Sequence, residues 1–142
     1  ATSDVFAAFL SDDPEAALMH GPTFMANALA CAAANASLDL FEREDRAAEA
    51  RAIETVLAVA LEPCRSLPGV VDVRTKGAIG VVELAEIYDV TWFRRRFIEL
   101  GVWLRPFGKI VYMTPALNIS ADDLAALTDA ILTVVMEWAE TR

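Results

Sequence analysis

The residues whose chemistry is easiest to interpret form the turn Gly21-Pro22-Thr23. An apolar pattern that starts at Met25 predicts that this turn leads directly into a helix. The first backbone N–H groups of a helix have no partner within it, so such a turn could hold a phosphate, with the Thr23 hydroxyl as a further donor. Alternatively, Thr23 simply caps the helix. The residues alone leave both interpretations open.

A second candidate is Arg105, which stands at the end of a predicted strand and directly before Pro106. Its guanidinium group offers a planar set of donors that matches a carboxylate. Tyr112 is predicted to lie across the same small hairpin, within reach of the same site. The alternative is that Arg105 is an ordinary surface residue, since most arginines are exposed.

Other reactive residue types form no recognisable catalytic or metal-binding pattern. His20 is the only histidine, and no nearby serine or cysteine lies in a nucleophile motif. Cys31 and Cys64 are far apart and have no neighbouring histidine, which argues against a disulfide framework or a zinc site. The pairs Asp12-Asp13 and Asp122-Asp123 stand at predicted helix starts, where negative charge is favourable, so neither predicts a metal site.

The composition narrows the class of protein. The chain has 142 residues, a size typical of one domain, and a formal net charge of −9, which disfavours binding to nucleic acid. Its hydrophobic content of 56% is high, which suggests that some apolar surface serves a partner. No apolar run reaches the about 20 residues that a membrane span needs, so we expect a cytoplasmic location.

The hydrophobic periodicity predicts helices followed by a small sheet with flanking helices, which is an α+β fold. Thr91 and Ser120 are the expected caps of two helices; Gly101 ends the helix that Thr91 caps, and Pro63 ends the preceding helix. The expected helices cover residues 25–40, 53–61, 92–100 and 124–138, and the expected strands cover residues 70–74, 78–84, 102–105 and 109–113.

Three blocks of sequence carry a resemblance to a known family. They are residues 18–25 (LMHGPTFM) with Asn27 and residues 29–34 (LACAAA), residues 77–83 (GAIGVVE), and residues 101–109 (GVWLRPFGK) with Tyr112. With the blocks in this order and spacing, the chain resembles the class III pyridoxal-phosphate aminotransferases. The resemblance extends over nearly all of the chain.

The resemblance implies roles for five residues. Pro22 and Thr23 match positions that hold the phosphate of pyridoxal 5'-phosphate, reaching across to the other subunit of a homodimer. Gly21 matches a substrate-contacting position. Arg105 matches the arginine that binds the carboxylate of the keto-acid substrate, and Tyr112 matches a tyrosine near that substrate.

The resemblance covers only the C-terminal third of the family's chain, so we expect this chain to be the C-terminal portion of a longer enzyme. Neither Lys76 nor Lys109 matches the motif of the family's Schiff-base lysine. No catalytic residue is therefore expected here, and the chain alone should be inactive. Residues 1–24 would belong to the large domain, residues 25–66 would link the domains, and residues 67–142 would form the small α+β domain of a fold-type I transferase.

Within the family, the blocks are most similar to enzymes of biotin biosynthesis. This implies that the full-length protein transfers an amino group from S-adenosyl-L-methionine to 8-amino-7-oxononanoate, giving 7,8-diaminononanoate. Two alternatives remain: a class III aminotransferase acting on an ω-amino acid or a diamine, and a non-catalytic α+β interaction module. The family usually has glycine at Ala26 and proline at Ala28, and these departures leave room for another substrate.

Overall fold

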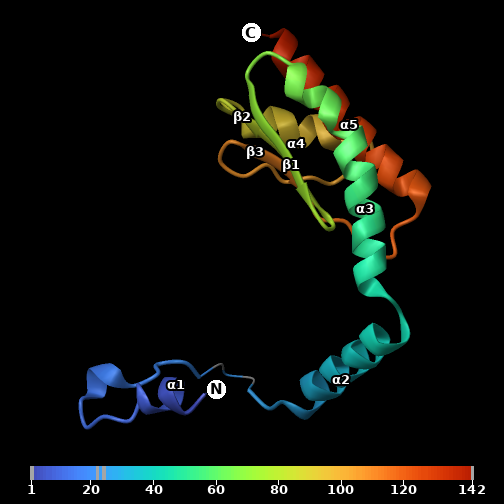
Figure 1. Ribbon diagram of the computed structural model, residues 1–142. Coiled ribbons are helices and arrows are strands. Elements are labelled where there is room, and N and C mark those ends of the chain that lie inside the picture. The colour runs from blue at the N-terminus through green and yellow to red at the C-terminus, as the bar shows by residue number, and fades with distance from the viewer. Residues whose placement is uncertain (1, 22, 24, 142) are drawn as a thin grey trace. The chain divides into compact units, whose positions relative to one another are not determined.

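The computed structural model describes residues 2–21, 23 and 25–141. The chain divides into two compact units, residues 1–43 and residues 44–142 (Figure 1). Helices and a small sheet make up the second unit, so the predicted α+β class is confirmed. In the part of the chain that the structure describes, no helix has the length and apolar character to cross a membrane.

The first unit contains the short helix α1 (Ser3–Ala7), the 3₁₀ turn η1 (Pro14–Ala16) and the longer helix α2 (Ala28–Arg43). None of the 16 residues of α2 is buried, and Leu29 on its apolar face is 83% exposed. An isolated helix of this length is marginal in water. Within its own unit, α2 therefore gains little stability from packing.

Two expectations for the turn before α2 are wrong. The turn does not lead directly into the helix, because α2 begins at Ala28, and Thr23 does not cap it. The cap is Asn27, whose side-chain Oδ1 accepts a hydrogen bond from the Ala30 amide at 3.0 Å. Ala26 interrupts the helical pattern because its φ of +56° lies in the left-handed region.

The two alanines that depart from the family pattern both lie at this helix start. Glycine adopts a positive φ without steric cost, whereas Ala26 has a Cβ that crowds the backbone there. Ala28 is the first residue of α2, a position that proline's fixed φ favours. This chain therefore has the less favourable residue at both positions.

The second unit begins with the helix α3 (Arg46–Ala60) and the 3₁₀ turn η2 (Glu62–Ser66). The strands β1 (Val70–Lys76) and β2 (Ile79–Leu84), the helix α4 (Val90–Glu99), the strand β3 (Ile110–Met113) and the helix α5 (Ala121–Glu140) follow. Helix α3, which was expected in the linking segment, packs on the sheet of this unit. The three-segment division itself remains a prediction.

The sheet is antiparallel, with the strand order β1-β2-β3. The predicted hairpin between residues 70 and 84 is confirmed, and Gly77 takes a left-handed φ of +53° in its turn. Strand β2 then pairs with β3, so that Val81 lies opposite Tyr112. The central strand is therefore β2, which belongs to the second block of the family resemblance.

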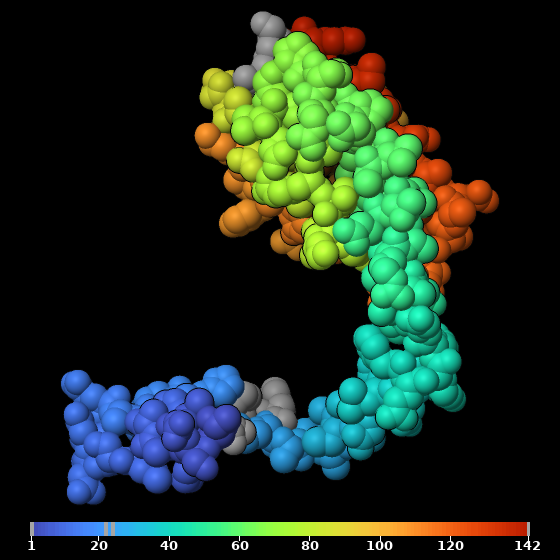
Figure 2. Space-filling model, viewed as in Figure 1, coloured from blue at the N-terminus to red at the C-terminus, as the bar shows by residue number. Residues whose placement is uncertain are grey.

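The core lies where the helices pack against the sheet, and every main element contributes to it. Leu57 of α3, Val82 of β2, Phe97 of α4, Val111 of β3 and Ile131 of α5 are all fully buried. Figure 1 shows α3 and α5 running side by side, and Figure 2 shows the elements of this unit packed into one continuous body. The predicted apolar stripe of α5 is confirmed, and that of α3 is confirmed for Ile53 and Leu57, whereas Val56, which was expected on the same stripe, is 44% exposed.

Two local predictions in the second unit are wrong. Asp89, not Thr91, caps α4, because its side chain accepts a hydrogen bond from the Trp92 amide at 2.9 Å. Residues 102–105 do not form a strand. Phe107 and Ile110 instead form an isolated bridge with hydrogen bonds of 2.9 Å in both directions, and the chain beyond Ile110 pairs with β2.

We expect Gly80→Ala to lower the free energy of unfolding by about 1–2 kcal/mol, the lower part of the range for overpacked cores. A Cβ at Gly80 would lie 2.8 Å from Leu61 Cδ1 and 3.4 Å from Met113 Cγ. Leu61 is fully buried, so its side chain has little space into which to move. The cost stays moderate because the nearest atom is the end of a side chain rather than backbone. Urea unfolding of the 142-residue chain measures the change.

Gly21→Ala is the matched control for this substitution. No atom lies within 4 Å of a Cβ built on Gly21, and its backbone is not left-handed. The control should unfold at the same urea concentration as the parent chain. Equal stability of both variants would contradict the close packing described for Gly80.

Candidate functional site

A pocket in the second unit contains both of the predicted substrate-binding residues of that unit, Arg105 and Tyr112. Its volume is about 380 Å³, and we call it the Arg105 pocket. Residues 103–105 form one part of the wall, and the end of β3 with the following residues 114–116 forms another. Ile119 and, from α5, Leu127 complete the lining. The volume is within the range of small-ligand sites, about 300–1,000 Å³.

The residues that flank Arg105 fix its position. Leu104 is 9% exposed and Pro106 is also buried, whereas Arg105 is exposed. In an extended segment, alternate side chains point to opposite sides, so the two buried neighbours direct Arg105 away from the core. Pro106 has no backbone N–H and cannot donate to a strand ladder, which is one reason that this segment remains outside the sheet.

The charge of Arg105 is not neutralised within the described part of the chain. Several other arginines of the second unit are paired, whereas the exposed Arg94 and Arg95 have no ion pair among the described residues. Arg96 donates two hydrogen bonds of 2.7 and 2.8 Å to Glu137, and Arg74 donates one of 2.6 Å to Glu83. The bonds from Arg96 lower the pKa of the Glu137 carboxyl. No described residue forms an ion pair with Arg105, and no carboxylate lines its pocket. The pocket can therefore offer a guanidinium group to an external anion.

Tyr112 reaches the Arg105 pocket by a route that differs from the prediction. It was expected across a hairpin from residues 102–105, but in β3 it lies opposite Val81 of the neighbouring strand. Val111 and Met113 on either side are buried, so Tyr112 faces away from the core. The structure thus brings Arg105 and Tyr112 to one pocket. Their roles in binding substrate remain predictions.

The apolar part of the Arg105 pocket was missed in the sequence. Trp103 is 69% exposed and lies on the pocket wall, together with Ile119 and Leu127. Trp103 stands two residues before Arg105, a spacing that places both side chains on one side of an extended segment. That spacing could have identified Trp103 as a further residue of the Arg105 pocket. No sequence signal connects Leu127 with this pocket, because its helical stripe is the one that also builds the core.

The predicted phosphate-binding residues Pro22 and Thr23 belong to the first unit, and so does Gly21, whose contact with the substrate remains a prediction. Gly21 and Thr23 are both exposed, while Pro22 lies outside the described residues. Since Asn27 caps α2, the Thr23 hydroxyl is not needed for that purpose. A contact between Thr23 and a phosphate remains a prediction.

The remaining reactive residues do not assemble a second chemical centre. Lys76 and Lys109 are exposed at turns of the sheet, and His20 is exposed in the first unit. Burial raises the pKa of the Cys64 thiol to about 11, so this cysteine stays protonated and unreactive at neutral pH. Among the described residues, no group of three or more histidine, cysteine or acidic side chains could hold a metal ion.

Comparisons with known proteins give a consistent result. A family model described as Aminotransferase class-III matches residues 1–135. An adenosylmethionine-8-amino-7-oxononanoate aminotransferase of Corynebacterium glutamicum is 43% identical over 115 residues, which are 81% of this chain and 27% of the relative. The enzyme of the same name from Mycobacterium leprae is 40% identical over 133 residues, 94% of this chain and 30% of the relative.

Solved structures show the same fold. The crystal structure of adenosylmethionine-8-amino-7-oxononanoate aminotransferase from Methanocaldococcus jannaschii matches with a TM-score of 0.77 and 28% identity, over 96% of this chain and 34% of that one. An (S)-enantioselective omega-transaminase from Thermomicrobium roseum matches with a TM-score of 0.74 and 23% identity, over 94% and 31% of the two chains. The chain thus spans about 30% of the length of the curated relatives that it matches.

Proposed function

The chain belongs to the class-III aminotransferase family, and we propose that it is the C-terminal portion of an enzyme that transfers an amino group from S-adenosyl-L-methionine to 8-amino-7-oxononanoate. The product would be 7,8-diaminononanoate, an intermediate of biotin biosynthesis. The curated relatives with about 40% identity carry the name of this activity. Since the chain spans only part of their length, the activity is assigned to the full-length protein.

The observation that supports this substrate class is Arg105, a cation without an ion-pair partner among the described residues, on the wall of a small-molecule pocket. A keto acid presents one carboxylate, and a guanidinium group can bind it through two parallel hydrogen bonds. The chain between the carboxylate and the carbonyl group of 8-amino-7-oxononanoate is apolar. Trp103 and Leu127 provide an apolar wall beside Arg105 for such a chain.

The residues of this chain would bind and orient the substrate rather than carry out the bond changes. Arg105 would hold the carboxylate, which fixes the distance of the carbonyl group from that end. Tyr112 lines the same pocket, and its hydroxyl would donate a hydrogen bond to a polar group of the substrate. Trp103 would exclude water from the bound chain. Fixing the substrate in this way lowers the entropic part of the barrier.

Pyridoxal 5'-phosphate fits the donor set of the first unit. Thr23 is exposed, and its hydroxyl is not committed to capping α2, so it can donate to a phosphate oxygen. When bound, the cofactor supplies the electron sink that amino transfer requires. We propose that Thr23 makes this contact with the cofactor of the other subunit of a homodimer, in the cytoplasm.

We expect the 142-residue chain, when purified alone, to show neither visible absorbance of bound pyridoxal phosphate nor transaminase activity. The only lysines are Lys76 and Lys109, and both are exposed at turns of the sheet, away from the Arg105 pocket. Nothing there would hold the cofactor covalently. Absorbance spectra after incubation with the cofactor and dialysis test the expectation. A cofactor band that survives dialysis in this chain would contradict it.

The activity itself is tested in the full-length protein loaded with cofactor. S-adenosyl-L-methionine with 8-amino-7-oxononanoate should give 7,8-diaminononanoate, which mass spectrometry identifies. The same protein is assayed with pyruvate as acceptor and either an ω-amino acid or a diamine as donor. A much higher kcat/KM with one of those pairs would reject the proposed substrate while leaving the family assignment intact.

A further inference from the structure

The lining of the Arg105 pocket divides into a polar part and an apolar part. Arg105 precedes β3, Tyr112 belongs to it and Thr114 directly follows it, so the polar groups all come from this region of the chain. Ile119 and Leu127 are apolar and come from the segment before α5 and from α5 itself. Among the described lining residues none is acidic, and Arg105 is the only basic one. The lining therefore matches a ligand with one anionic group and an apolar body.

Helix α5 fixes the position of Leu127. The side chain is half-buried, so it packs against the core and also lines the pocket. On the same helix, Leu124 and Thr128 are 5% and 3% exposed, and Ile131 is fully buried. Because a close-packed core leaves little free space, these contacts hold the helix, and with it Leu127, in place. This part of the pocket wall is therefore rigid.

The segment that carries the cation is attached to the same core. Leu104 and Pro106 on either side of Arg105 are buried. Leu104 belongs to the same core cluster as the buried residues of α5. The fold therefore holds the backbone of Arg105 and that of Leu127 at a fixed separation. A short acid bound to Arg105 fills only part of the pocket volume of about 380 Å³, whereas a longer aliphatic chain has room to reach the α5 wall.

We propose that Leu127 is a specificity-determining residue, whose contact with the aliphatic chain makes the Arg105 pocket favour long monocarboxylic acids over short ones. The identity of the reacting acid rests on the proposed function, whereas the role of Leu127 rests on the pocket wall described above. Arg105 binds the carboxylate of a long and of a short acid equally, so it does not distinguish them. Each methylene group that the apolar wall removes from water strengthens binding by up to about fourfold, and only a long chain gains this.

Calorimetric titration of the full-length protein, with its cofactor bound, tests the proposal with nonanoate and butanoate as probes. Both acids carry one carboxylate, and they differ only in the length of the alkyl chain. The parent protein should bind nonanoate at least about twentyfold more tightly than butanoate, as expected for several methylene groups that are partly buried. Equal affinity for the two acids would overturn the proposal, because the pocket would then recognise only the carboxylate.

Three variants separate the role of Leu127 from general effects of altering α5. Leu127→Ala should weaken nonanoate binding about five- to tenfold and leave butanoate binding nearly unchanged. Leu127→Met keeps the volume and the apolar character, so it should retain most of the affinity. Leu132→Ala is the matched control, since Leu132 is also half-buried against the core from α5 but does not line the pocket. Equal effects of Leu127→Ala and Leu132→Ala on nonanoate binding would overturn the proposal.

Turnover by the same proteins separates this proposal from the proposed function. The ratio of kcat/KM for 8-amino-7-oxononanoate to that for pyruvate should fall about five- to tenfold in Leu127→Ala and stay unchanged in Leu132→Ala. Loss of folded protein lowers both values alike, so the ratio reports specificity. A parent that converts 8-amino-7-oxononanoate with a ratio that Leu127→Ala does not change would overturn the role of Leu127 alone. A parent that does not convert this acid, yet shows the expected binding of nonanoate, would reject the proposed substrate and still support the role of Leu127.

Discussion

Replacing Arg105 with alanine in the full-length protein should lower kcat/KM for the keto acid. The decrease should correspond to a loss of about 2–5 kcal/mol of transition-state stabilisation. The reason is that a bound carboxylate would lose its only cationic partner on the described wall of the pocket. Cofactor affinity should be nearly unchanged, because the arginine binds the far end of the substrate. Steady-state kinetics with 8-amino-7-oxononanoate measure the loss.

Three controls make the result specific. Arg105→Lys keeps the charge but loses the planar pair of donors, so it should already lower kcat/KM. Arg94→Ala removes an exposed arginine of α4 that does not line the pocket and should have little effect. The methyl ester of the substrate has no carboxylate, so its turnover should be insensitive to Arg105→Ala. An equal loss for acid and ester would show that Arg105 does not recognise the carboxylate.

Thr23→Ala in the full-length protein should weaken cofactor binding by about 1–3 kcal/mol, the scale of a hydrogen bond to a charged group. The structure sharpens this prediction, since a role of Thr23 as the cap of α2 is now excluded. The substitution should leave the stability of the apo-protein almost unchanged. Titration of the apo-protein with pyridoxal phosphate, together with thermal unfolding, measures both quantities.

Asn27→Ala is the matched control for Thr23→Ala. It removes the hydrogen bond to the Ala30 amide, so it should destabilise the start of α2 by about 1 kcal/mol. A contact of Thr23 with the phosphate predicts opposite patterns: lower cofactor affinity for Thr23→Ala and lower helix stability for Asn27→Ala. If Thr23→Ala leaves cofactor affinity unchanged, Thr23 does not hold the phosphate.

The parts of the fold that could be predicted are those with strong local signals. The hairpin around Gly77 combines β-branched runs with a turn residue, and the apolar stripe of α5 repeats over about four turns after the Ser120 cap. The observed Ser120 cap, with an Oγ that accepts from the Asp123 amide at 3.0 Å, agrees with its sequence pattern. Local sequence determines these elements because their hydrogen bonds join residues that are near one another in the chain.

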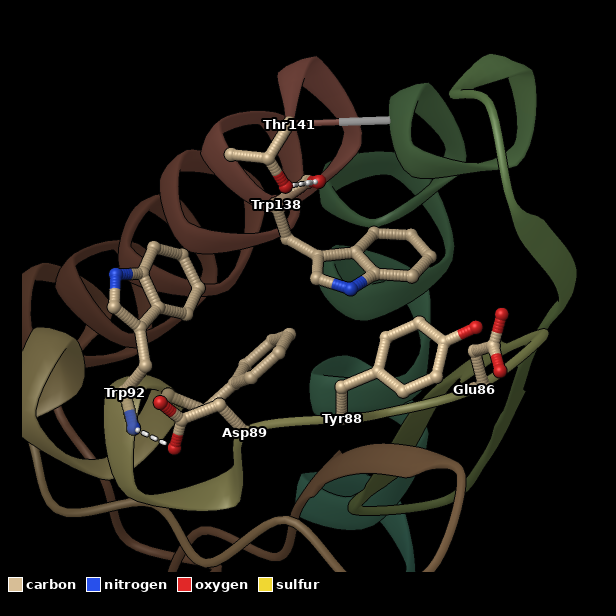
Figure 3. Close-up of a pocket in the computed structure, with 7 residues that line it drawn as sticks. Glu86, Tyr88, Asp89, Trp92, Trp138 and Thr141 are labelled. Carbon is tan, nitrogen blue, oxygen red and sulfur yellow. Dashed lines mark hydrogen bonds between the residues drawn. The ribbon is translucent and has the colours of Figure 1, made fainter.

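The errors arise where contacts between residues far apart in the sequence determine the local structure. Residues 102–105 have the composition of a strand, yet they join neither open edge of the sheet, and one reason is that the following Pro106 has no backbone N–H to donate to a ladder. The cap of α2 was misplaced because the left-handed Ala26 has no sequence signature. A second pocket, which Tyr88, Trp92 and Trp138 help to line (Figure 3), could not be predicted because Tyr88 and Trp138 are 50 residues apart in the sequence. In the Arg105 pocket, similarly, only the fold joins the residues of β3 and α5.

The division of the chain at Arg43 has a consequence for genetics. Substitutions in the core of residues 44–142 act on folding, so the resulting alleles should be temperature-sensitive. The described part of the first unit contains no residue that this chain itself buries. Alleles at Thr23 should instead lose function at every temperature, and extra vitamin B6 in the growth medium should rescue them, because a higher cofactor concentration compensates for weaker binding. Growth assays on medium without biotin would thus sort alleles of this one chain into a heat-sensitive and a vitamin-responsive class.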